Sequence, residues 1–157
     1  MTKKTSIPTI LVCIDTSHAS EVALRYACLK AKRLGFAVEI LSVIESSHKN
    51  LLFGSQTIGR EKRNQLEKYL KVLIESIYKE TNLTPIVSIS EGDVASEIIK
   101  EVKQNANFIM VILGKSHSSA SDNNVLPKMA QKIGTKIRIP IMIVPENMTP
   151  DLFKLMA

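Results

Sequence analysis

The chain has 157 residues, which suits one domain because domains typically contain about 100 to 200 residues. Hydrophobic residues make up 45% of the chain and charged residues 23%, as in ordinary soluble globular proteins, and the net charge of +6 is dispersed. No apolar run reaches the ~18 residues that span a bilayer, and two cysteines are too few for a disulfide scaffold or a zinc site. We therefore expect no membrane segment, and we expect Cys13 and Cys28 to be buried free thiols.

Five short apolar segments alternate with longer segments of helical periodicity. In chain order, the predicted strands are 8–14, 37–44, 84–90, 108–113 and 141–145. The predicted helices lie between them, at 17–35, 60–80, 93–102 and 125–137, and a short tail follows the last strand. Ser17 or Ser20 can cap the first helix and Gly35 can end it. The polar stretch 45–59 has little periodicity and interrupts the alternation.

Five strands joined by four helical crossovers predict a single parallel sheet with helices on both faces. In a doubly wound sheet of this kind, ligands bind beyond the carboxyl ends of the strands, where the strand order reverses. The strands that end at Asp15 and Gly114 could flank this point. We expect one domain over 1–157, with a core at 7–146 and a short tail at 147–157.

Asp15, Ser17, Ser20 and Ala23 form an Asp-x-Ser pattern that continues onto the first predicted helix. Four further motifs follow along the chain: SVIE at 42–45, GDVASEIIKEV at 92–102, NFIMVILG at 107–114 and IRIPIMIVPE at 137–146. In order and spacing, these motifs resemble those of the universal stress protein family. The resemblance covers about residues 7–146 and implies an α/β, doubly wound fold of the flavodoxin-like or adenine nucleotide alpha hydrolase-like type, with a stress-response role.

The resemblance also implies where a nucleotide would bind. Asp15 is placed to accept hydrogen bonds from a base or ribose, and nucleotide-binding members contact adenine through the backbone at the position of Val43. The residues themselves leave two other interpretations open. Asp15 could cap the following helix, and Val43 could simply belong to the core.

The glycine loop of ATP-binding members is largely replaced in this chain. Those members have Gly-x2-Gly-x9-Gly followed by Ser or Thr, and the corresponding positions here are Gly114, His117, Pro127 and Lys128. Only the first glycine is kept, and Pro127 has no backbone N–H to offer a phosphate. The stretch is then either an unspecialised polar loop or an anion cradle made of side chains. The candidates for such a cradle are Lys115, His117 and Lys128, with Ser116, Ser118, Ser119 and Ser121.

We expect a non-catalytic stress-response protein that acts by binding a ligand or a protein partner, because no catalytic or metal-binding spacing occurs. Whether the chain is an enzyme stays open. One alternative is an ATP-binding protein with slow hydrolase or switch activity at the crevice between Asp15 and Gly114. Another is a basic nucleic-acid-associated module, but in the most basic stretch, 60–71, acidic residues are interleaved with the basic ones, which favours the solvated face of a helix.

The last strand predicts how the chain assembles. It is apolar and is expected at the edge of the sheet, where an unpaired strand is a liability. Universal stress proteins often pair there as homodimers, through the positions of Ile141, Met142, Ile143 and Val144; the alternative is that the tail covers this edge. The first residues pass directly into a predicted strand, so we expect no signal peptide and a cytoplasmic location.

Overall fold

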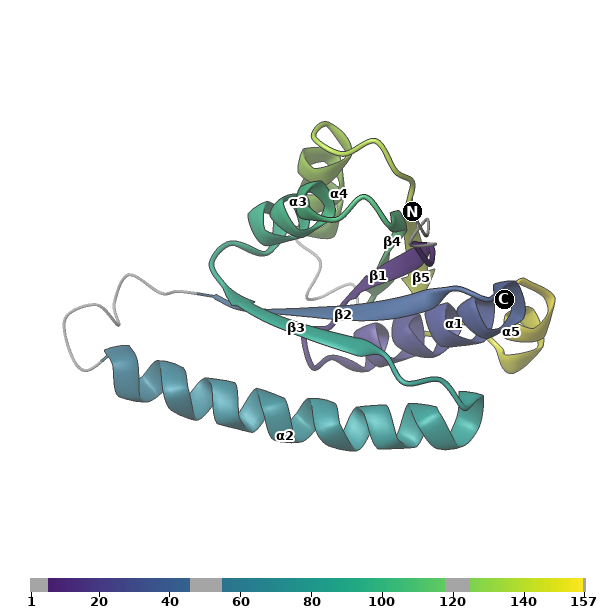
Figure 1. Cartoon of the computed structure of the whole chain (residues 1–157), viewed down its shortest axis with the longest axis horizontal. Coiled ribbons are helices and arrows are strands. Elements are labelled where there is room, and N and C mark those ends of the chain that lie inside the picture. The colour runs from purple at the N-terminus through teal and green to yellow at the C-terminus, as the bar shows by residue number, and fades with distance from the viewer. Residues whose placement is uncertain (1–5, 46–54, 118–124, 157) are drawn as a thin grey trace, which may run out of the picture.

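The computed structural model describes residues 6–45, 55–117 and 125–156. They form a five-stranded parallel sheet with helices on both faces, as predicted (Figure 1). The strands are β1 (Thr9–Cys13), β2 (Ala37–Ile44), β3 (Ile86–Glu91), β4 (Phe108–Lys115) and β5 (Ile141–Pro145). The helices are α1 (His18–Leu34), α2 (Ser55–Thr81), α3 (Val94–Gln104), α4 (Val125–Gly134) and α5 (Pro150–Met156).

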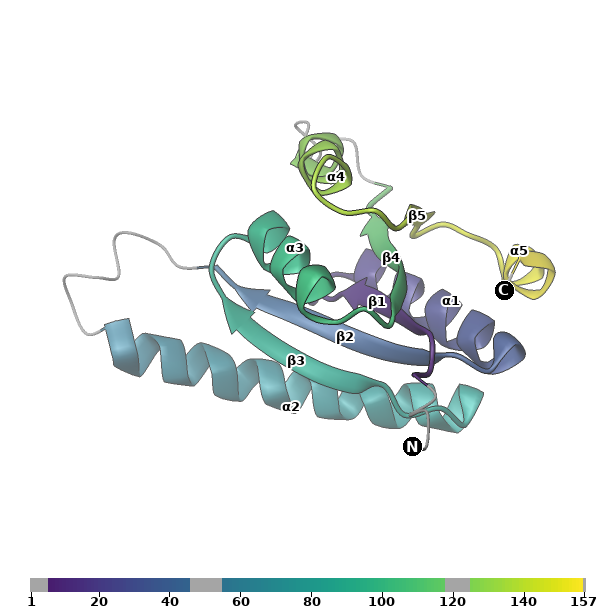
Figure 2. The ribbon, with the colours of Figure 1, turned by 45° about the horizontal axis from the view of Figure 1, so that its top comes forward.

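The strand order is β3-β2-β1-β4-β5, and every neighbouring pair is parallel (Figure 2). The chain moves outward from β1 to β2 and β3, then crosses back to place β4 on the other side of β1. The order therefore reverses between β1 and β4, the two strands that lead to Asp15 and Gly114. This is the position at which doubly wound sheets form their ligand crevice.

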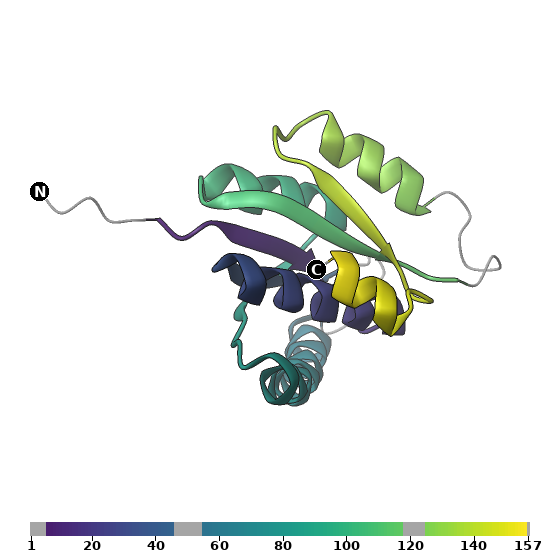
Figure 3. The ribbon, with the colours of Figure 1, turned by 90° about the vertical axis from the view of Figure 1, so that its right-hand side faces the viewer.

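Helices lie on both faces of the sheet (Figure 3), and an apolar core fills the space between each face and its helices. Successive side chains of a strand point to opposite faces, so Ile10 and Val12 of β1 pack toward α1, α2 and α5. Leu11, between them, packs toward α3 and α4. Both faces of β1 are thus buried, which explains why its sequence is a continuous apolar run and not an alternating one.

The helix boundaries confirm some predictions and correct others. Ser17 caps α1 by accepting a hydrogen bond from the Ser20 N–H at 3.2 Å, and Gly35 ends it with a left-handed φ of 72°. α2 begins at Ser55, so the end of the stretch predicted to be irregular is helical. Residues 46–54 lie outside the part of the chain that the structure describes.

The described residues contain five helices, one more than predicted, because the tail folds into α5. Its Phe153 is buried and its ring packs against that of Tyr26 in α1, with 5.9 Å between the ring centroids. A helix of seven residues with one buried side chain shows little periodicity, and for this reason the sequence pattern misses it. Within the described ranges, no helix has both the length and the apolar character needed to cross a membrane.

Candidate functional site

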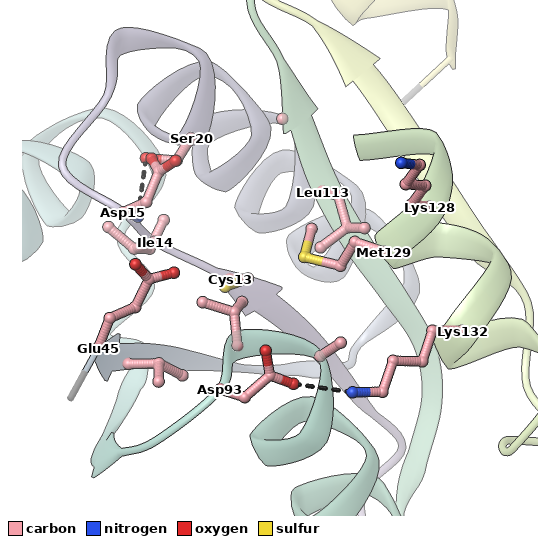
Figure 4. A pocket seen from close by; sticks show the side chains of 14 residues that line it. Cys13, Ile14, Asp15, Ser20, Glu45, Asp93, Leu113, Lys128, Met129 and Lys132 are labelled. Atoms are coloured by element: carbon pink, nitrogen blue, oxygen red, sulfur yellow. Dashed lines mark hydrogen bonds and ion pairs between the residues drawn. The ribbon is translucent and has the colours of Figure 1, made fainter. Parts of the chain in front are cut away.

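A cavity of about 480 Å³ lies at the strand-order reversal, beyond the carboxyl ends of β1 and β4 (Figure 4). The turn after β1, the ends of β2 and β4, the start of α3 and one side of α4 form its walls. Its lining residues are Cys13, Ile14, Asp15, Ser20, Val43, Glu45, Asp93, Val94, Ala95, Leu113, Gly114, Lys128, Met129 and Lys132. The structure therefore has a cavity where the sequence predicted a ligand crevice.

Four of the six residues proposed from the sequence line this cavity: Asp15, Val43, Gly114 and Lys128. Val43 is half-buried and also packs against the core beneath α3 and α4, so it serves the core and the cavity at once. The other two, Lys115 and His117, are exposed and lie one and three residues after Gly114, outside the lining.

Asp15 organises the turn between β1 and α1. Its Oδ1 accepts hydrogen bonds from the backbone N–H of Ser17, at 3.0 Å, and from the Ser17 hydroxyl. Ser17 in turn caps α1, so Asp15 supports the cap and is not the cap itself. Among the described residues, no donor reaches the second carboxylate oxygen of Asp15, which is available to a ligand.

The same turn contains a strained residue. Thr16 has a φ of 67°, in the left-handed region that β-branched residues rarely adopt. The two hydrogen bonds from Ser17 to Asp15 hold the chain on both sides of it. Backbone strain of this kind concentrates at ligand-binding sites, where the surrounding structure enforces it.

Gly114 is required by packing. A Cβ built on it would lie 2.3 Å from the carbonyl oxygen of Ala19 and 2.8 Å from the backbone nitrogen of Ser20. Backbone atoms cannot move aside as a flexible side chain would. The one glycine of the loop that this chain keeps is thus the glycine that lets β4 pass the first turn of α1.

An ion pair joins α3 and α4 at one side of the cavity (Figure 4). Asp93 caps α3 by accepting from the Ser96 N–H at 3.0 Å and the Ser96 hydroxyl at 2.7 Å, and Lys132 donates to the same carboxylate at 3.0 Å. The hydrogen bond from the Ser96 hydroxyl, with that from Lys132, lowers the pKa of Asp93 to about 2. Asp93 is therefore ionised and its charge is matched by Lys132.

The remaining lining is apolar with an acidic rim. Three carboxylates, Asp15, Glu45 and Asp93, face two lysines, of which Lys132 is paired and Lys128 has no ion pair among the described residues. The apolar lining residues are Cys13, Ile14, Val43, Val94, Ala95, Leu113 and Met129. Such a surface suits a flat, largely uncharged ligand that offers hydroxyl or amino donors to the carboxylates.

Cys13 contributes to this wall as a neutral thiol. Burial, with a smaller effect from the charge of Asp15, raises its pKa to about 12. Cys28 is buried in α1, and burial raises its pKa to about 12 as well. Both cysteines are free thiols; Cys28 is buried, as predicted, whereas Cys13 is half-buried. The described ranges contain no group of three His, Cys, Asp or Glu side chains that could hold a metal ion.

Beside the cavity, a second hollow of about 470 Å³ lies on the α2 side of the same turn and shares Asp15, Val43 and Glu45. Here α2 contributes Lys62 and Leu66. Asp15 therefore lines both spaces.

The chain after β4 is held by Glu146, which sequence reasoning did not single out. The Glu146 N–H donates to the Lys115 carbonyl at 2.9 Å and thereby extends the pairing of β5 with β4. Its Oε1 accepts from the His117 N–H and from the Ser116 hydroxyl at 3.3 Å. The serines proposed further along this loop, Ser118, Ser119 and Ser121, lie outside the described residues.

The fold and this cavity define a class: doubly wound α/β domains with a ligand crevice where the strand order reverses. Within that class, the model of the universal stress protein family matches residues 7–145. The chain belongs to the universal stress protein family and is a stress-response protein of that type. None of the curated protein sequences matches it.

Solved structures of this family share the fold. The universal stress protein UspA from Lactobacillus plantarum aligns with a TM-score of 0.73 at 15% identity, covering 88% of this chain and 97% of that one. A family protein from Burkholderia pseudomallei gives 0.69 at 15% identity, covering 90% and 98%. One from Arabidopsis thaliana with AMP bound gives 0.56 at 18% identity, covering 92% and 94%.

Proposed function

We propose that this protein is a non-catalytic binding protein of the stress response, whose crevice holds a small ligand with an adenosine-like part. The observation that carries the proposal is the Asp15 carboxylate, which has one oxygen available at an apolar-walled cavity beside Val43. A ribose hydroxyl or an exocyclic amine could donate to this oxygen while the base lies on the apolar wall. The related Arabidopsis structure contains AMP, which supports this class of ligand.

The test compares thermal unfolding with and without AMP in the native protein and in Asp15→Asn. The asparagine keeps an acceptor for Ser17 but loses the charge. A ligand at ~100 times its dissociation constant stabilises the folded state by ~2.7 kcal/mol, so a clear rise in melting temperature is expected for the native protein and a much smaller one for the variant. Asp151→Asn, an exposed carboxylate of α5, is the matched control and should respond as the native protein does.

Two results would contradict the proposal. The native protein would show no shift with AMP and would carry no nucleotide through purification, or Asp15→Asn would respond as strongly as the control. The first result would leave protein binding as the surviving form of the hypothesis. The second would move the ligand away from Asp15.

We propose a homodimer that pairs through β5, and a cytoplasmic location in keeping with two free thiols. β5 forms one edge of the sheet, and its Ile143 is 42% exposed. The other three residues proposed for the interface are less available: Val144 is buried in the core, and Ile141 and Met142 are half-buried against it. Support for the dimer therefore rests on the strand edge and on Ile143.

The C-terminal tail, which folds into α5, also bears on whether the chain forms a dimer. α5 packs against α1 through Phe153 and Tyr26 and leaves Leu152, Leu155 and Met156 exposed. The alternative in which these side chains cover the β5 edge within one chain has no support from these exposures. They are instead available to extend an interface between two copies.

A further inference from the structure

The chain places one of its own carboxylates on the first hydrogen-bond donors after β4. Glu146 Oε1 accepts from the Ser116 hydroxyl and from the His117 N–H, two and three residues beyond Gly114. The Glu146 backbone is itself fixed by its 2.9 Å hydrogen bond to the Lys115 carbonyl. Glu146 is therefore held there by three contacts with the start of this loop, two through its carboxylate and one through its backbone N–H.

Backbone N–H groups in this position are suited to anions. In doubly wound sheets the loops at the carboxyl ends of the strands bind ligand phosphates through such donors. Here the donors already have an anionic partner that is covalently part of the protein. A ligand phosphate that approached Gly114 would find them occupied and would meet a like charge beside them.

The cavity offers little compensation for several negative charges. Asp15, Glu45 and Asp93 all line it, and Lys132 is already committed to Asp93 at 3.0 Å. Among the described lining residues, Lys128 is the cation that remains for a ligand. Each additional phosphate therefore adds repulsion that one lysine has to offset.

We infer that the crevice selects a nucleoside or nucleoside monophosphate over a nucleoside polyphosphate, and that Glu146 is a specificity-determining residue for this choice. The inference rests on the proposed adenosine-type ligand and specifies how much charge that ligand carries. Glu146 acts as an internal substitute for a ligand phosphate: it satisfies the Ser116 and His117 donors and disfavours polyphosphates by its charge.

The experiment measures binding of adenosine, AMP, ATP and inorganic tripolyphosphate by calorimetry at low salt, for the native protein and Glu146→Gln. Glutamine keeps an acceptor oxygen for Ser116 and His117 and removes the charge. The native protein should bind ATP about tenfold or more weakly than adenosine. Glu146→Gln should reduce this gap in affinity between adenosine and ATP by about tenfold, or ~1.4 kcal/mol. Glu75→Gln, an exposed carboxylate on α2, makes the same change in net charge and should leave the gap as it is.

The inference is overturned if the native protein binds ATP as tightly as adenosine, or if Glu146→Gln changes the gap no more than Glu75→Gln does. Tripolyphosphate separates this inference from the proposed function, because it has no nucleoside. If no nucleoside binds, the proposed ligand class is wrong. In that case a gain of tripolyphosphate binding in Glu146→Gln alone still supports the role of Glu146, and no gain refutes it.

Discussion

Gly114 and Ala19 approach so closely that a Cβ on Gly114 would lie 2.3 Å from the Ala19 carbonyl oxygen. Real Cβ atoms do not come this near to a backbone oxygen, so any larger residue at this position has to push β4 and α1 apart. Both elements border the crevice. The contact thus links the stability of the fold directly to the shape of the candidate site.

Gly114→Ala should therefore lower the free energy of unfolding by about 1 to 3 kcal/mol, as overpacking against rigid neighbours does. Urea denaturation measures the change. Gly59→Ala is the control, because Gly59 lies inside α2 with its nearest atom, a Glu91 carboxylate oxygen, 3.9 Å from the added Cβ. The control should gain up to about 1 kcal/mol from helix propensity. A Gly114→Ala protein as stable as the native one would show that β4 and α1 can separate at no cost.

Removing Asp93 should cost more than removing the lysine to which it is paired. Asp93→Ala loses the cap of α3 and is expected to destabilise by about 1 kcal/mol. Lys132→Ala breaks an exposed ion pair, with side chains 53% and 62% exposed, and should cost less than about 0.5 kcal/mol. Asp93→Asn retains a capping oxygen and should stay close to the native protein. If Lys132→Ala were the more damaging change, the ion pair and not the cap would hold this side of the crevice together.

Glu39 should make the protein less stable as the pH rises from about 4.5 to about 7. Burial against α3, then the hydrogen bond and charge of Glu101, raise the pKa of Glu39 from 4.5 to about 7. The folded state therefore binds a proton that the unfolded chain has released, so stability falls between about pH 4.5 and pH 7 and stays low above that range. Glu39→Gln removes this penalty.

Denaturation curves from pH 4.5 to pH 8 test this. Glu39→Gln should be more stable than the native protein by about 1 kcal/mol at pH 8, with the difference vanishing near pH 4.5. Glu75→Gln, which is exposed on α2, should follow the native curve throughout. A constant offset between Glu39→Gln and the native protein at every pH would rule out the titration as its cause.

Ile143→Asp should weaken the proposed dimer without unfolding the chain, because Ile143 is 42% exposed at the β5 edge. Val144→Asp is unsuitable for this purpose, because Val144 is only 2% exposed and an aspartate there would disrupt the core. Sedimentation equilibrium is expected to show a dimer for the native protein and a shift toward monomer for Ile143→Asp. Ile86→Asp, on the opposite edge strand β3, is the control and should remain dimeric. A monomeric native protein would refute the proposal.

Much of the fold could be predicted because burial on both faces of a parallel sheet requires uninterrupted apolar runs. The run 108–113 is such a segment, and it lies in β4 of the structure. Gly35 and Ser17 mark the ends of α1 for local reasons, a left-handed φ and a capping hydroxyl. α5 was not predicted because its position depends on contacts with α1 between residues far apart in the chain, namely the Phe153–Tyr26 ring contact and the hydrogen bonds from Tyr26 and Lys30 to the Met156 carbonyl.

The residues of the candidate site also fall into those that the sequence predicts and those that it does not. Asp15 and Gly114 could be proposed from the sequence because they follow or end apolar strands, and the ends of parallel strands meet at one edge. The residues that pair with each other around the site could not be predicted from the sequence. Lys132 lies 39 residues from Asp93, and Glu146 lies 29 residues from His117, so neither pair leaves a local pattern.

The sequence by itself determined the alternation of strands and helices, the position of the crevice and the loss of the glycine loop, since these depend on residue type and local spacing. Only the tertiary structure decided that Glu146 occupies the donors at the start of that loop, that Asp93 and Lys132 close one side of the cavity, and that Gly114 serves packing. These relationships depend on the register of β4 with β5 and on where each helix lies against the sheet. Many residues set that arrangement jointly through the two cores, and no single motif records it.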